Sequence, residues 1–393
     1  MLLAAAVGLA VFGLALTVAL RVFFPIFDLP APAGPYGIGT VTYHWVDASR
    51  REVFVSDPAV HRELMVQVWY PAKTESSARR EPYIDDPAML VPLAHLLHLP
   101  GFVFRHLKRV RTNAVEAAPV EVGLPAFPLL VCSHGRGGYR QEDTWLVEEL
   151  VSQGYIVAAI DHPYAASGVG FPDGRRAMFD ARMCDRRFAG SKIPYLAQDA
   201  SFALNELTAV DGADPHGMLT GHIDTSRVGI FGLSLGGEIS AQAALEDERI
   251  RACMVIDAWM PPEVLCRGLC QPTMFLTRDA ETMEREGWSA ADASETLTTM
   301  RAVYDTLPAA GYFVQVRGMF HQDFSDAPLL SPLTSVLGLT GPIEPKRAHD
   351  ILTAYSLAFF DSALKGQARP LLDTSSSRYP EVRAEARTSV GAL

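Results

Sequence analysis

The stretch "RVGIFGLSLGGEISAQAAL", residues 227–245, decides the fold. An apolar run over residues 228–231 leads to Ser234, which stands between Gly232 and Gly236, and a helix-like apolar pattern follows. If the serine occupies a tight turn between a strand and a helix, its hydroxyl is exposed at the edge of a sheet, where it can meet a substrate. An ordinary glycine-rich loop would carry the same residues, so the remainder of the chain must distinguish the two interpretations.

The segments around this stretch favour a sheet covered by helices. From residue 127 onward, short apolar runs alternate with segments of helical periodicity, which indicates a mainly parallel sheet with helices on both faces. Residues 39–72 alternate in polarity and are rich in β-branched and aromatic residues, which is typical of antiparallel strands. The expected fold class is therefore α/β. In such sheets functional residues follow the carboxyl ends of strands, as Ser234, Asp257 and His321 do here.

Length and composition allow one large domain or two ordinary ones, and we expect a single catalytic domain. With 393 residues, 49% of them hydrophobic, the chain can bury a large core, and we assign residues 39–370 to it. Pro- and Gly-rich residues 28–38 are interpreted as a linker, and residues 371–393 as a C-terminal tail. A net charge of −11 argues against a nucleic-acid partner. The five cysteines are too few for a disulfide framework, and we expect neither a metal nor a cofactor.

The N-terminus predicts an anchor. Residues 2–20 carry no charge and are long enough to cross a bilayer core, so we assign residues 1–27 to a transmembrane anchor or an uncleaved signal. A cleaved signal peptide is the alternative, because "APA" at residues 31–33 resembles a cleavage site. The expected location is therefore the membrane, with an extracytoplasmic catalytic domain.

Ser234 has partners in the right order for nucleophilic catalysis. A serine hydroxyl needs a base to take its proton and a third group to orient that base. In an α/β-hydrolase the order along the chain is serine, acid, histidine, and here Ser234 precedes Asp257 and His321. Asp279, after the next predicted strand, is an alternative acid, and periodicity does not choose between the two. His349, near the closing helix, is a weaker alternative base.

Acyl transfer also needs hydrogen-bond donors for the oxyanion. We expect one to be the backbone N–H of Leu235, directly after the nucleophile, and the other that of Arg136 in the glycine-rich turn 133–140. A phosphate-binding loop is the alternative for that turn, but it lacks the Gly-Lys-Ser/Thr ending. His134 in this turn and His162 after the following strand are expected to be structural or to line the pocket.

Several stretches together resemble the platelet-activating factor acetylhydrolase family, the group VII phospholipases A2 and their bacterial relatives. The resemblance implies an α/β-hydrolase fold with the acid after the strand that follows the serine, which selects Asp257 over Asp279. It also implies oxyanion donation by the backbone of Arg136 and Leu235. The animal enzymes carry an aromatic residue after the serine and an apolar residue in the glycine-rich turn, so the acyl pocket differs here. The matching stretches are "VQVWYPA", "CSHGRGGYR", "SQGYIVAAIDH", "GIFGLSLGG", "VIDAWMPP" and "GMFHQDFSD".

The expected function is that of a membrane-tethered serine esterase acting on short or oxidised acyl esters, such as the sn-2 ester of phospholipids. Residues 89–111 place leucines and phenylalanines beside basic side chains, so they form either an interfacial element or a lid. One alternative is a general carboxylesterase of the dienelactone hydrolase or polyester-hydrolase type. The other is a non-enzymatic, membrane-bound binding module, against which the complete set of serine, acid and histidine argues.

Overall fold

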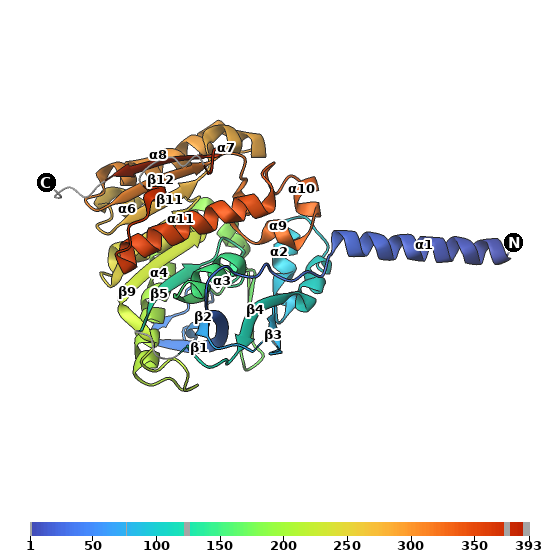
Figure 1. The fold of residues 1–393 in the computed structure, drawn as a ribbon, viewed down its shortest axis with the longest axis horizontal. Helices are drawn as coiled ribbons and strands as arrows, with labels where there is room; N and C mark the ends of the chain where they lie inside the picture. Colours follow the sequence, from blue (N-terminus) through green and yellow to red (C-terminus); the bar gives the residue numbers. More distant parts are fainter. Residues whose placement is uncertain (1, 76, 122–125, 373–377, 388–393) are drawn as a thin grey trace.

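The computed structural model describes residues 2–75, 77–121, 126–372 and 378–387. Figure 1 shows a broad sheet with helices on both sides, and helix α1 projecting away from it. The described part of the chain contains no helix that is both long and apolar enough to cross a membrane. The transmembrane anchor predicted over residues 1–27 therefore finds no support in the structure. Met1 and several side chains of α1 lie outside the described part.

Eleven of the described strands form one sheet in the order β13-β12-β11-β10-β9-β5-β6-β2-β1-β4-β3. The strands from β6 to β12 in this order run parallel. At one side β2 pairs antiparallel with both β6 and β1, and β1 pairs parallel with β4, while at the other edge β13 pairs antiparallel with β12. The predicted α/β fold with N-terminal antiparallel strands is thus observed. The strands are β1 (Gly37–Arg51), β2 (His61–Ala72), β3 (Arg80–Pro82), β4 (Arg111–Glu116), β5 (Phe127–Ser133), β6 (Ile156–Asp161), β7 (Gly168–Gly170), β8 (Arg176–Met178), β9 (Ile223–Leu233), β10 (Ile250–Ile256), β11 (Thr273–Thr277), β12 (Gly311–Val316) and β13 (Val382–Arg387).

The central strands are apolar throughout because both faces of the sheet are covered. Successive side chains of a strand point to opposite faces. In β5, Leu129 and Val131 join the core beneath α4, α5 and α8, while Leu130 and Cys132 join the core beneath α3 and α11. The α-helices are α1 (Leu2–Phe23), α2 (Val91–Leu96), α3 (Thr144–Ser152), α4 (Arg186–Gly212), α5 (Leu235–Glu246), α6 (Pro262–Arg267), α7 (Ala280–Glu286), α8 (Ala290–Thr306), α9 (Ala327–Leu330), α10 (Leu333–Val336) and α11 (Pro345–Lys365).

Two segments are more ordered than a tail and a simple lid would be. Residues 382–387, assigned from the sequence to a C-terminal tail, form β13 and extend the sheet beside β12. Residues 89–111 fold into short helical turns whose buried residues pack with Trp145 and Leu330 in a small satellite core. The 3₁₀ helices are η1 (Pro87–Leu90), η2 (Val103–Arg109), η3 (Ala181–Cys184), η4 (His321–Phe324) and η5 (Pro370–Leu372).

Candidate active site

Ser234 lies on a sharp turn between β9 and α5. Its backbone has φ 56° and ψ −121°, a conformation that costs a non-glycine residue about 1–3 kcal/mol and that is found preferentially at functional sites. The turn requires glycine on both sides. A Cβ atom on Gly236 would lie 1.9 Å from the carbonyl oxygen of Ser133, and one on Gly232 would lie 2.4 Å from the backbone of Gly236. The Gly-x-Ser-x-Gly spacing therefore reflects close backbone packing at a strand-to-helix corner.

The structure brings His321 and Asp257 together. His321 begins η4 just after β12, and its Nδ1 lies 2.5 Å from Oδ2 of Asp257, which follows β10. A carboxylate can only accept, so the Nδ1–H donates to it, and Nε2 is the ring nitrogen left to accept a proton. Oδ1 of Asp257 accepts a second hydrogen bond from Oγ1 of Thr277, at 2.6 Å. His321 and Ser234 line the same cavity.

Arg278 is a buried cation beside this carboxylate. Its Nη2 lies 2.9 Å from Oδ2 of Asp257, and its Nη1 forms an ion pair with Glu286. Burial by itself raises the pKa of Asp257, but the charge of Arg278 and the hydrogen bonds from His321 and Thr277 outweigh it and hold the pKa well below its usual range. Glu286 also accepts from the backbone N–H of His321, at 3.2 Å to Oε2.

Removing the Arg278 charge is expected to change the pH dependence of activity. In Arg278→Met, burial acts on Asp257 without the opposing cation, so its carboxylate takes up a proton at a higher pH. The kcat/KM on a soluble ester should therefore fall relative to the parent, and this loss should grow as the pH falls, because more of Asp257 is then protonated. Arg278→Lys keeps the charge and should retain the parent profile. A kcat/KM in Arg278→Met that does not fall relative to the parent as the pH falls would contradict this role.

Both predicted oxyanion donors belong to residues near Ser234: Leu235 follows it directly, and a Cβ on Gly135, the neighbour of Arg136, would lie 3.8 Å from Cβ of Ser234. Leu235 begins α5, so its N–H has no partner inside the helix and lies at the positive end of the helix dipole. Arg136 lies in the turn after β5 and lines the cavity together with Gly135. Among the described residues, neither amide N–H has a hydrogen-bond partner. Two free N–H groups near a serine are the arrangement that acyl transfer needs.

Glu142 holds the turn that carries Arg136, a role that the sequence did not suggest. Its carboxylate accepts from the backbone N–H of Gly135, and a Cβ on Gly138 would lie 1.8 Å from its Oε2. Burial raises the pKa of Glu142 to about 8. The sequence pattern could not reveal the role of Glu142, because its partner is the backbone N–H of Gly135, seven residues earlier in a loop.

The alternative residues take other roles. The carboxylate of Asp279 caps α7 by accepting from the N–H of Thr282 at 2.8 Å. His349 is buried in α11 and stacks on Trp145, with ring centroids 3.4 Å apart. His134 and His162 lie beneath the turn, both buried, and neither lines the cavity. The structure therefore pairs His321 with Asp257 and leaves Asp279 and His349 outside the site.

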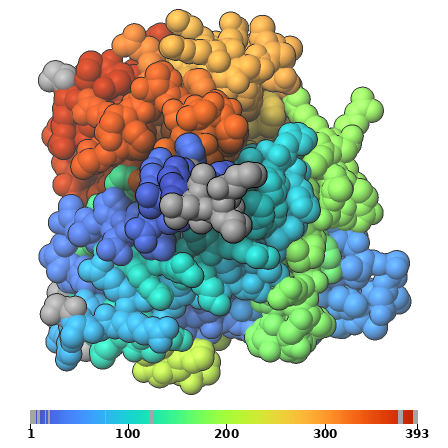
Figure 2. All heavy atoms as spheres, turned by 90° about the vertical axis from the view of Figure 1, so that its right-hand side faces the viewer, coloured from blue at the N-terminus to red at the C-terminus, as the bar shows by residue number. Residues whose placement is uncertain are grey.

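The cavity over Ser234 has a volume of about 430 Å³ and is mainly apolar. Residues 89–111 supply one wall and residues 327–339 another, and Phe24 lines it just beyond the end of α1. Figure 2 looks along α1, which stands in front of the boundary between the cyan and orange segments. Close to His321, Trp259 and Trp288 stack with centroids 5.8 Å apart.

Comparisons with known proteins point to one group of esterases. The family model described as platelet-activating factor acetylhydrolase, isoform II, matches residues 22–170 and 206–369. A platelet-activating factor acetylhydrolase of Cavia porcellus is 25% identical over 86% of this chain and 78% of its own length. A probable 1-alkyl-2-acetylglycerophosphocholine esterase of Arthroderma benhamiae is 25% identical over 91% and 93%. A ferulic acid esterase from Streptomyces cinnamoneus matches in structure with a TM-score of 0.75 and 31% identity, over 91% of this chain and 99% of that one.

Proposed function

Because the chain belongs to the platelet-activating factor acetylhydrolase, isoform II, family, we propose that Ser234, His321 and Asp257 are the catalytic triad of a serine esterase. The protein is a carboxylic ester hydrolase that acts on acyl esters. The observation that carries the assignment of residues is the 2.5 Å contact between His321 and Asp257, on a cavity that Ser234 also lines.

The geometry supports a two-step acyl transfer. Nε2 of His321 takes the hydroxyl proton as Oγ of Ser234 attacks the ester carbonyl, and Asp257 stabilises the imidazolium that forms. The N–H groups of Leu235 and Arg136 donate to the oxygen as its negative charge develops. His321 then returns the proton to the leaving alcohol, and the C–O bond of the ester breaks. Water, activated by the same histidine, frees the acid from Ser234.

The cavity favours a substrate with a long apolar part. Its walls carry Leu93, Leu96 and Phe104 on one side and Leu330 on the other, and it reaches Phe24. We propose that the sn-2 ester of a phospholipid, with a short or oxidised acyl group, lies at Ser234 while an aliphatic chain lies between these walls. Burial of such a chain contributes about 0.8 kcal/mol per methylene group.

The surface beside the cavity supports contact with lipid. Phe102 is 55% exposed, and Val336 and Leu337 are 76% and 51% exposed, with Leu337 lining the cavity itself. Arg105 and Lys108 are exposed in the same segment as Phe102. An apolar surface with basic side chains fits the headgroup layer of a bilayer. We therefore propose residues 89–111 as the interfacial element of the enzyme.

Esters of aromatic acids are the second candidate substrates. The stacked Trp259 and Trp288 offer aromatic surface, and the ring of Trp288 lies 5.7 Å from that of His321. The similar Streptomyces protein is a ferulic acid esterase. An aryl acyl group could stack on these tryptophans while its carbonyl carbon meets Ser234. This is a special case of the general carboxylesterase, of which dienelactone- and polyester-hydrolysing enzymes are further examples.

A substrate panel separates these candidates. We expect the highest kcat/KM on a 1-alkyl-2-acetyl phospholipid presented in vesicles, and at least about 10-fold less on methyl ferulate, since the apolar walls bind an alkyl chain that ferulate lacks. The p-nitrophenyl esters of increasing chain length serve as soluble references. A higher kcat/KM on methyl ferulate would indicate instead that an aromatic acyl group binds at the two tryptophans. If the protein hydrolyses none of the p-nitrophenyl esters, the esterase mechanism itself is contradicted.

A further inference from the structure

A second row of serine, histidine and aspartate lies beneath the candidate site, and the proposed reaction does not use it. Nε2 of His162 is 3.1 Å from Oγ of Ser133, and its Nδ1 is 2.9 Å from Oδ2 of Asp199. All three residues are fully buried. Because no substrate can reach Ser133, this row is not a second nucleophilic centre, and its function must be exerted through its neighbours.

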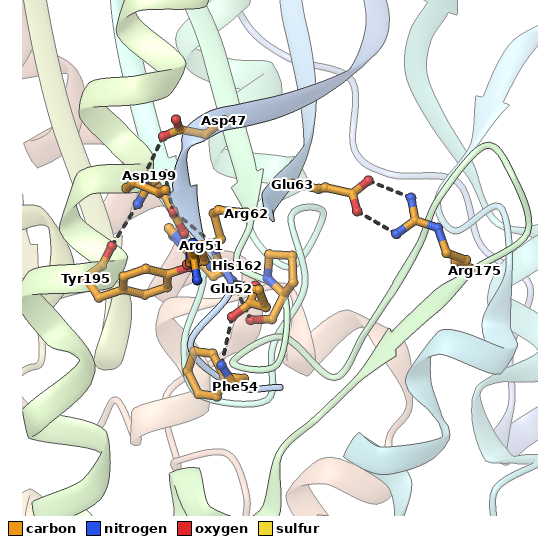
Figure 3. Close-up of polar contacts among 12 residues, drawn as sticks. Asp47, Arg51, Glu52, Phe54, Arg62, Glu63, His162, Arg175, Tyr195 and Asp199 are labelled. Carbon is orange, nitrogen blue, oxygen red and sulfur yellow. Dashed lines mark hydrogen bonds and ion pairs between the residues drawn. The ribbon is translucent and has the colours of Figure 1, made fainter. Parts of the chain in front are cut away.

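The far end of the row is fixed by charge. Arg62, fully buried in β2, donates from Nε to Oδ1 of Asp199 at 3.0 Å and from Nη2 to Oδ2 at 2.5 Å. Its Nη1 donates to Glu52 at 2.8 Å and to the carbonyl oxygen of Pro163 at 3.2 Å. Figure 3 shows this guanidinium between its acidic partners, with His162 beside it. Burial raises the pKa of Asp199, but the charge of Arg62 prevails and lowers it, so the carboxylate is a fixed anion that orients His162.

The near end of the row touches the nucleophile turn. Ser133 is the last residue of β5. Its carbonyl oxygen packs so closely against Gly236 that a Cβ atom added to Gly236 would lie only 1.9 Å from it. The next residue, His134, accepts at Nε2 from the backbone N–H of His162 at 3.1 Å, and its Nδ1–H donates to the carbonyl oxygen of Gly135 at 2.7 Å. The position of Ser133 therefore affects both the turn that carries Ser234 and the turn that carries Arg136.

The segment after His162 supports the Arg136 turn directly. The N–H of Gly137 donates to the carbonyl oxygen of Ala165 at 2.8 Å, and the N–H of Ser167 donates to that of Gly138 at 2.8 Å. The N–H of Ala165 in turn donates to the carbonyl oxygen of His162 at 3.0 Å. The turn that carries Arg136 is therefore hydrogen-bonded to a second turn. This second turn begins at His162, the residue that contacts both Asp199 and Ser133.

We propose that Ser133, His162 and Asp199 form a positioning network that sets the distance between the amide of Arg136 and the amide of Leu235. This inference rests on the proposed function, because it assigns a role in the oxyanion hole of that reaction. An oxyanion donor must lie about 2.7–3.1 Å from the developing charge, and loss of one donor costs about 10²–10³ in kcat. A displaced donor costs less than a lost one, so we expect an intermediate effect from weakening the network.

The test is Ser133→Ala, which removes only the hydroxyl that contacts His162. We expect kcat on p-nitrophenyl butyrate to fall about 10-fold or more with KM within about 2-fold of the parent, since the oxyanion develops after binding. The inhibition constant of a trifluoromethyl ketone, which forms a tetrahedral oxyanion on Ser234, should rise by a similar factor. Ser240→Ala is the matched control, because Ser240 is a fully buried serine on α5 whose Oγ has no hydrogen-bond partner among the described residues.

Each outcome decides the question. Parent values of kcat and of the ketone inhibition constant in Ser133→Ala would overturn the proposal. A lower melting temperature with an unchanged ketone inhibition constant would also overturn it, because the row would then only stabilise the fold. Asp199→Asn weakens the hydrogen bond to Nδ1 of His162. A folded Asp199→Asn protein should therefore also have a lower kcat than the parent. If the parent protein itself hydrolyses no ester, the failure belongs to the proposed function.

Discussion

Replacing Ser234 with alanine is expected to lower kcat on p-nitrophenyl butyrate by about 10⁶, the effect of removing the triad nucleophile in a serine protease. No acyl-enzyme can form without the hydroxyl, and the residual rate comes from binding and the oxyanion donors alone. The fold should survive, since the replaced side chain faces the cavity. Initial rates and the melting temperature of both proteins measure the two effects.

A fluorophosphonate probe identifies the nucleophile independently. It should label the parent at Ser234 and leave Ser234→Ala unlabelled, as mapped by mass spectrometry of peptides. Ser325 and Ser331 line the same cavity and are the residues that the probe would reach if the assignment were mistaken. Labelling of either in the variant, together with retained activity, would contradict the role of Ser234. The hydroxyls of both already donate to backbone carbonyl oxygens, so we expect neither to react.

The strand-to-helix turn could be predicted because its constraints are local. An apolar strand, a serine and two glycines at fixed spacing describe a corner in which Gly232 and Gly236 leave no room for a Cβ atom. The pairing of Asp257 with His321 needed more than pattern, because periodicity treated Asp257 and Asp279 alike and only the family resemblance separated them. The start of α7 carried a local clue, since an aspartate directly before a helix is typical of an N-cap.

The supporting residues could not be predicted, because each acts on a partner that is distant in the chain or on a backbone group. Arg278 follows β11 and meets Asp257 only because β10 and β11 lie side by side. Asp199 meets His162 because α4 packs against the sheet near the end of β6. Strand β13 pairs with β12 from a segment that we assigned from the sequence to a C-terminal tail. Such long-range contacts cannot be predicted from a single sequence, whereas the apolar periodicity that specifies strands and helices is local and can be.

Replacing Asp257 with asparagine is expected to lower kcat by about 10⁴, the effect of the same change in a serine protease. The amide can donate to Nδ1 of His321, which favours the tautomer that carries its hydrogen on Nε2 and cannot accept the Ser234 proton. It also carries no charge to stabilise the imidazolium. Glu286 still pairs with Arg278 in this variant, so the buried guanidinium keeps one counter-ion and the protein should fold. Steady-state kinetics and the melting temperature together measure the effect.

Asp279→Asn is the matched control for this change. Asparagine caps a helix about as well as aspartate does, so α7 should be retained at a cost of a few tenths of a kcal/mol. Because the Asp279 carboxylate bonds to the N–H of Thr282 and not to His321, kcat should stay within about 2-fold of the parent. The two variants remove one carboxylate charge each, from positions 22 residues apart that follow adjacent strands. A large loss of kcat in Asp279→Asn with a mild one in Asp257→Asn would make Asp279 the acid of the triad. Equal losses in the two variants would contradict the assignment of Asp257 as the single acid that orients His321.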